Sequence, residues 1–106
     1  MKPIAFSGFD WDDGNRLKCQ KHGLALADVE HALAHGVALL QPDAVHSEAE
    51  PRFLAIGRTR DGRYAFVVFT PRRREGDTIL RPISARHMHA KEVMRYEQEI
   101  ARAEQR

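Results

Sequence analysis

The stretch Thr78–Tyr96 has the sequence TILRPISARHMHAKEVMRY and passes from a β-rich segment into a helical one. It predicts a strand that breaks at Pro82–Ser84 and a helix that begins near Ala90. Four cationic or titratable side chains lie at this junction: Arg81, Arg86, His87 and His89. A strand needs apolar residues and has no structural reason to gather such groups, so the junction indicates a binding or catalytic site.

The strand of this stretch is the last of three β-rich runs. Phe53–Thr59 and Arg63–Thr70 precede Thr78–Ser84. Asp61–Gly62, between the first two runs, is a strong signal for a hairpin turn. We expect Arg72–Asp77 to be a charged loop between the second and third, so the three runs predict an antiparallel meander. Proline removes one hydrogen bond of the ladder, and its place in the last run predicts an edge strand or a bulge there.

The first residues of the chain predict a strand and a short helix. Apolar residues alternate loosely over Ile4–Trp11, which is typical of a strand. Asp12 or Asp13 can cap a helix that runs through Lys21 and is stopped by Gly23.

Two further helices complete the predicted fold. One of them ends at Gly36, and its apolar face is made by Leu26, Val29, Ala32 and Leu33. Gln41–Pro51 predicts a loop or a short edge strand around Ala44–Ser47. The last helix begins near Ala90 and should pack on the sheet through Val93, Met94, Tyr96 and Ile100. The predicted fold class is α+β: an antiparallel sheet, made of the N-terminal strand and the meander, with two N-terminal helices and one C-terminal helix.

Length and composition exclude several classes of protein. The 106 residues predict one domain, residues 1–106, with a single core. No apolar run approaches the roughly 18 residues that a membrane span needs, and we expect no signal peptide. A single cysteine, Cys19, excludes an internal disulfide and suits a reducing cytoplasm. Its most ordinary role is that of a half-buried small residue on a helix.

The net charge of +2 is unevenly distributed. Residues 1–50 hold four Lys and Arg against eight Asp and Glu, whereas residues 51–106 hold thirteen against seven. Such asymmetry predicts a face that binds a polyanion, and nucleic acid is the commonest one. A solvated surface without a partner is the alternative. Together with the cationic junction, the charge leads to the hypothesis that RNA phosphate is bound there.

Three blocks of the chain resemble a known family. They are FDWDDGNRLKCQKHG (Phe9–Gly23), RFLAIGRTRDGRYAFVVFT (Arg52–Thr70) and RPISARHMHAKEVMRYE (Arg81–Glu97), and they resemble the BrnT toxins of BrnT/BrnA type II toxin–antitoxin systems. The resemblance implies a RelE-like fold, RNA cleavage that inhibits translation, and neutralisation by a small DNA-binding, BrnA-like antitoxin. It implies no DNA binding by this chain except through that antitoxin.

Cleavage of RNA without a metal needs a base for the 2′-hydroxyl, cations for the charge that develops on the phosphate, and an acid for the leaving 5′-oxygen. It leaves a 2′,3′-cyclic phosphate. Arg81 and Arg86 are the best candidates for the cations because guanidinium is planar, always charged and bidentate. The alternative is that each arginine forms a salt bridge, to Asp12 or to Glu92, and serves only to stabilise the fold.

His22 is the leading candidate for the base or the acid, because imidazole titrates near neutral pH. Helix capping is the alternative, since a histidine at a helix C-terminus can bond the last carbonyls. The neighbouring Lys21 could hold phosphate or lie in solvent. Ser84 could donate to phosphate or cap the following helix.

Further candidates lie beyond the junction. Glu92 and Tyr96 are four residues apart on one helix face and could take part in proton transfer, or could only orient an arginine or complete the edge of the core. Arg58, Arg63 and Arg72 are expected to steer RNA or to bind the antitoxin. The alternative is that they belong to a solvent-exposed loop and bind nothing.

Six histidines raise the question of a metal site. His31 and His35 are spaced i, i+4, but no cysteine or carboxylate completes a recognisable pattern around them. We therefore predict neither a metal nor a cofactor. The second hypothesis for the whole chain is a non-catalytic α+β module, a decayed toxin homologue, that binds nucleic acid or protein.

Overall fold

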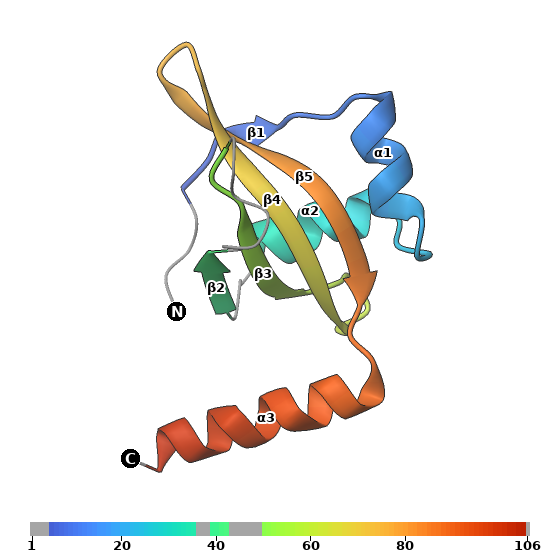
Figure 1. Cartoon of the computed structure of the whole chain (residues 1–106), viewed down its shortest axis with the longest axis vertical. Helices are drawn as coiled ribbons and strands as arrows, with labels where there is room; N and C mark the ends of the chain where they lie inside the picture. Colours follow the sequence, from blue (N-terminus) through green and yellow to red (C-terminus); the bar gives the residue numbers. More distant parts are fainter. Residues whose placement is uncertain (1–4, 36–38, 43–49, 106) are drawn as a thin grey trace.

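The computed structural model describes residues 5–35, 39–42 and 50–105. Within this part of the chain, five strands form one sheet in the order β1-β5-β4-β3-β2 (Figure 1). The strands are β1 (Gly8–Phe9), β2 (Leu39–Pro42), β3 (Phe53–Arg58), β4 (Tyr64–Arg74) and β5 (Asp77–His87). The helices are α1 (Asp13–Gln20), α2 (Leu26–Ala34) and α3 (Ala90–Glu104). The α+β class is confirmed.

The sheet is antiparallel except at one edge. The predicted meander is confirmed as β3, β4 and β5, and β2 pairs antiparallel with β3. The short β1 runs parallel to β5, with Gly8 opposite Ile79 and Phe9 opposite Leu80. The prediction of a wholly antiparallel sheet is therefore wrong at β1, which covers only two residues of the predicted strand over Ile4–Trp11. Ile4, Gly36 and Ala44–Ser47 lie outside the described residues.

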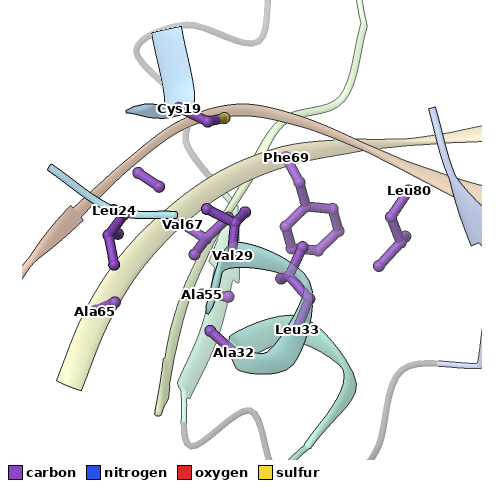
Figure 2. Packing of buried hydrophobic residues seen from close by; sticks show 11 residues of the cluster. Cys19, Leu24, Val29, Ala32, Leu33, Ala55, Ala65, Val67, Phe69 and Leu80 are labelled. Atoms are coloured by element: carbon purple, nitrogen blue, oxygen red, sulfur yellow. The ribbon is translucent and has the colours of Figure 1, made fainter. Parts of the chain in front are cut away.

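Helix α2 lies behind the sheet and α1 beside β5, and both form the core with the sheet (Figure 1). Helix α1 packs on β5, and α2 packs on β3 and β4. Figure 2 shows Leu33 of α2 beside the ring of Phe69, and Val29 beside Val67. Cys19 of α1 is buried in the same cluster, and burial raises the pKa of its thiol to about 11. Cys19 is thus a small residue packed on a helix, as expected, but it is fully rather than half buried.

The connection between β4 and β5 differs from the prediction. Residues 72–77 were expected to form a loop, but β4 continues to Arg74 and β5 begins at Asp77. Glu75 and Gly76 alone form the turn, and their φ angles of 52° and 86° fit the two-residue turns that suit strand twist. Charged residues can extend a hairpin beyond the sheet because both of its faces are then exposed to water.

Of the two features that the proline predicted, an edge strand or a bulge, the structure shows the bulge, and the strand does not break at Pro82–Ser84. Val68 lies opposite Ser84 and Phe69 opposite Pro82, so Ile83 is the extra residue of β5. The strand continues to His87. Because β5 lies between β1 and β4, the proline is tolerated by the bulge rather than by an edge position.

The prediction that the last helix packs on the sheet is also wrong. None of the residues of α3 is buried, and Figure 1 shows the helix lying apart from the sheet along most of its length. It contacts the body of the protein near its N-terminal end, where Glu92 and Tyr96 meet residues of β5 and β4. No helix of the described residues is long and apolar enough to cross a membrane.

Asn15 ties α1 to the sheet. Its amide Nδ2 donates to the carbonyls of Asp10 and Pro82, both at 2.8 Å, so one side chain joins α1 to the segment after β1 and to the bulge of β5. Its Oδ1 accepts from the N–H of Asp12, and its own N–H donates to the carboxylate of Asp12, which completes the capping box of α1.

We expect Asn15→Ala to lower the free energy of unfolding by about 3 kcal/mol, because it removes three side-chain hydrogen bonds at a residue that is only 4% exposed. Urea denaturation followed by circular dichroism measures this loss. Gln20→Ala is the matched control, since the amide of Gln20 bonds only a carbonyl of its own helix at the surface. Equal, small losses in both variants would contradict the role of Asn15.

Candidate functional site

The face of the sheet opposite α2 carries a shallow depression. Side chains alternate along each strand, so the neighbours of core residues Ala55, Val67 and Ala85 point to this other face. The register places Leu54 beside Val68 and Val68 beside Ser84, with Phe66 beside Arg86. These side chains and His22 line a volume of about 320 Å³.

Two further depressions adjoin the first along β5. His22, Val68 and Ser84 also line the second, of about 350 Å³. Lys18, Arg52 and Ile83 are shared by the second and a third, of about 300 Å³. We call the three together the basic groove, because one acidic residue of its lining, Glu50, stands against the cationic or titratable residues Lys18, Lys21, His22, Arg52, Arg72, Arg81 and Arg86.

Arg86 is held rigidly at one end of the basic groove. Its Nη1 and Nη2 donate to the two carboxylate oxygens of Glu92 at 2.8 and 2.9 Å, and Nη1 also donates to the carbonyl of His87. The guanidinium carbon lies 4.7 Å from the ring centroid of Phe66. The side chain remains 36% exposed, so a fixed cation is available to a ligand.

Arg81 lies at the other end of the groove and is more buried, with 19% of its side chain exposed. Its Nη2 is 2.8 Å from the carboxylate of Asp12, and its Nη1 is 3.7 Å from that of Asp10. The salt bridges that the sequence offered as alternatives to phosphate binding are thus both present, Arg81 with Asp12 and Arg86 with Glu92. Both arginines nevertheless line the groove.

Glu92 is ionised over the whole physiological range. The hydrogen bonds from Arg86 and from the N–H of His89 lower its pKa from an ordinary value of 4.5 to about 2. A carboxylate with so low a pKa is a poor proton acceptor near neutral pH. Its two hydrogen bonds with Arg86 are those of a group that positions this arginine.

This pKa predicts how stability depends on pH. The folded-state pKa lies below the unfolded value, so the pair stabilises the fold fully above about pH 4.5 and loses that effect as the pH falls towards 2. We expect the melting temperature of Glu92→Gln to fall less than that of wild type between pH 5 and 3. Calorimetry at several pH values tests this, and parallel curves for the two proteins would contradict it.

The groove brings together only some of the predicted residues. The groove is lined by Lys21, His22, Arg72, Arg81, Ser84 and Arg86. Glu92 does not line the groove but accepts hydrogen bonds from Arg86. Among the described residues, His22 makes no side-chain hydrogen bond, so the alternative role, capping of α1 by its ring, is not seen. Arg72 bridges Glu50 and Asp10, at 2.9 and 3.1 Å.

Arg58, Arg63 and Tyr96 lie elsewhere. Arg58 stacks over the ring of Tyr64 at 4.2 Å and donates to the carbonyl of Gly62. The ring of Tyr96 packs edge-on against Tyr64, with centroids 5.4 Å apart. Arg58 and Arg63 line a separate depression beside the start of α3, so these three residues do not join the basic groove.

Sequence reasoning missed Lys18 and Arg52 as members of the groove. Lys18 stands three residues before Lys21, and this spacing places both on one side of α1. Arg52 directly precedes β3, whose next open-face residue is Leu54. The helical spacing was a usable signal for Lys18, whereas the position of Arg52 depends on the pairing of β3 with β4.

The histidines do not form a metal centre within the described residues. The rings of His31 and His35 stack on each other at 4.5 Å, and Nδ1 of His31 lies 2.9 Å from the carbonyl of Arg58. No group of three or more His, Cys, Asp or Glu residues in the described part of the chain has the geometry of a metal site.

A comparison of the sequence with known protein families shows to which family the chain belongs. The family described as "Ribonuclease toxin, BrnT, of type II toxin-antitoxin system" matches residues 11–92. The chain belongs to the BrnT family. The match spans α1, the whole meander and the first turn of α3, so it includes every residue of the basic groove. A search of curated proteins gives no match. Membership of the BrnT family identifies the chain as a ribonuclease toxin, with RNA as substrate and an antitoxin as partner.

Proposed function

We propose that the chain is a metal-independent endoribonuclease that cuts RNA in the basic groove, leaves a 2′,3′-cyclic phosphate and thereby inhibits translation in the cytoplasm. The observation that carries the proposal is the line of cations from Arg81 to Arg86, with the exposed ring of His22 between them. A row of fixed cations matches the phosphates of a single strand.

The residues of the groove fit the three tasks of the reaction. His22 takes the proton of the 2′-hydroxyl or gives one to the leaving 5′-oxygen, since imidazole does either near neutral pH. Arg86 stabilises the charge on the phosphate oxygens beside His22, and Lys21 and Ser84 help to hold this phosphate. Arg81, at the other end of the groove, binds a neighbouring phosphate of the RNA. Glu92 positions Arg86 through the bidentate pair. Arg72 binds the RNA further along the groove. Arg58, Arg63 and Tyr96 can contact RNA only where it extends beyond the groove.

The neutralising partner follows from the family. We propose a BrnA-like antitoxin with a DNA-binding part of its own, which inhibits the toxin by covering the basic groove. Its acidic residues would replace RNA phosphates at Arg81 and Arg86, where carboxylates already serve as ligands within the chain. Binding of DNA then occurs only through the antitoxin.

A test uses purified protein and total RNA in the presence of EDTA. We expect cleavage at the same rate as in magnesium, because every proposed catalytic group belongs to the chain. End-group analysis of the fragments should show 2′,3′-cyclic phosphates and 5′-hydroxyls. Cleavage that stops in EDTA would contradict the metal-independent mechanism.

One observation favours a second candidate, the non-catalytic binding module. Arg81 and Arg86 are each paired with carboxylates, as they would be in a scaffold. A protein that is harmless when induced in bacteria and leaves RNA intact, yet binds it, would establish this candidate in place of the nuclease.

A further inference from the structure

The basic groove has two chemically distinct sides. Its cations Lys18, Lys21 and Arg52 gather around the second and third depressions. The first depression has instead an apolar floor made by Leu54, Phe66 and Val68, which come from the two neighbouring strands β3 and β4. Each of these three side chains is only partly buried. A nucleotide has the same two parts, a charged phosphate and an apolar base.

Arg86 gives the apolar floor a rigid wall. Its guanidinium stacks on Phe66 at 4.7 Å and is fixed by two hydrogen bonds to Glu92. The side of a fixed, planar guanidinium that faces away from the ring is a surface on which a base can stack. Besides the guanidinium of Arg86, the residues around the floor offer few hydrogen-bonding groups to a base, chiefly the hydroxyl of Ser84 and the ring of His22.

The size of the depression limits what it admits. About 320 Å³ accommodates one planar base, and the cations of the groove begin directly beside it at His22 and Ser84. Bases of a double helix are stacked and paired, so they cannot enter a depression in a sheet face, whereas an unstacked base of a single strand can.

We propose that Leu54, Phe66 and Val68, with Arg86 as a wall, form a subsite that stacks one unpaired nucleobase next to the phosphate bound at His22 and Ser84. The substrate class is then single-stranded RNA, with little discrimination among bases, since stacking accepts every base. This inference rests on the proposed function, because it places RNA in the same groove.

The test measures binding separately from cleavage. The probe is a short single-stranded 2′-O-methyl oligoribonucleotide, which lacks the attacking hydroxyl, labelled for fluorescence anisotropy. Abasic sites are placed at each position in turn. We expect one position at which the abasic site weakens binding about 10-fold, with small effects elsewhere.

Variants then connect that position to the subsite. Val68→Ser and Leu54→Ser should each weaken binding of the intact probe several-fold, but should have no further effect on the probe that is abasic at the sensitive position. Leu17→Ser is the matched control, because Leu17 is an exposed leucine on α1 that lies outside the groove. Circular dichroism confirms that each variant is folded.

The possible outcomes separate the subsite from the nuclease. A uniform response along the abasic series, or variants that weaken all probes equally, would overturn the subsite, whether or not all-ribose RNA is cut. A sensitive position that depends on Val68, together with no cleavage of all-ribose RNA, would support the subsite and overturn the nuclease. Absence of any binding would overturn both.

Discussion

Arg86→Ala is expected to lower the rate of RNA cleavage by about 10²–10³-fold, which is the usual loss when one fixed donor to a developing negative charge is removed. The expectation follows from the exposure and the rigidity of this guanidinium in the basic groove. Steady-state cleavage of a short fluorogenic oligoribonucleotide measures the effect, and induction of the variant in bacteria should no longer arrest growth.

The lysine variant shows what the arginine contributes. Arg86→Lys keeps the charge but cannot form two parallel hydrogen bonds to Glu92 or stack a planar group on Phe66. We therefore expect Arg86→Lys to recover little activity. Glu92→Gln leaves the guanidinium in place with weaker support and should cause a smaller loss than Arg86→Ala.

Arg60→Ala is the matched control for the loss of a paired arginine. Arg60 donates from Nε to the carboxylate of Asp28 at 2.9 Å, in an ion pair like that of Arg86 but away from the groove. It should retain wild-type cleavage. If Arg86→Ala and Arg60→Ala behaved alike, Arg86 would have no part in the reaction.

Local patterns predicted most of the elements, since the caps, turns and strand segments depend on residues close in sequence. The capping residue Asp12, the stop at Gly23 and the turn at Asp61–Gly62 are all confirmed. The errors concern long-range relations. The parallel pairing of β1 depends on where α1 and α2 return the chain. The sequence left an edge strand and a bulge open at Pro82, and the pairing of Val68 with Ser84 decides for the bulge.

The candidate site shows the same limit. Arg81, Arg86 and His22 were identified by residue type and by their position at ends of elements, and the structure places them on one groove. Arg58 and Tyr96 had the same kind of residue pattern but pack around Tyr64 instead. No sequence signal separates the two groups, because the face on which a strand residue lies depends on register with its neighbours.

Gly57→Ala is expected to destabilise the fold more than alanine at any other glycine of the described residues. A Cβ at Gly57 would lie 2.2 Å from the carbonyl oxygen of Ala32 and 2.8 Å from its carbonyl carbon. Both are backbone atoms of α2, so no side chain can turn away, and the helix must move off β3. Small residues at this contact let α2 approach the sheet closely, as Ala32 and Ala55 are both fully buried.

The displacement would open the core along α2, where Val29 and Leu33 are packed against the sheet. We expect a loss of about 3 kcal/mol or more in the free energy of unfolding, and a fall in melting temperature of roughly 10–20 °C. Gly8→Ala is the control, because a Cβ there meets no atom within 4 Å. Thermal melts of the two variants test the packing directly: a Gly57→Ala protein as stable as Gly8→Ala would mean that α2 does not lie against β3 at Ala32, and the support beneath the apolar floor of the groove would then need another explanation.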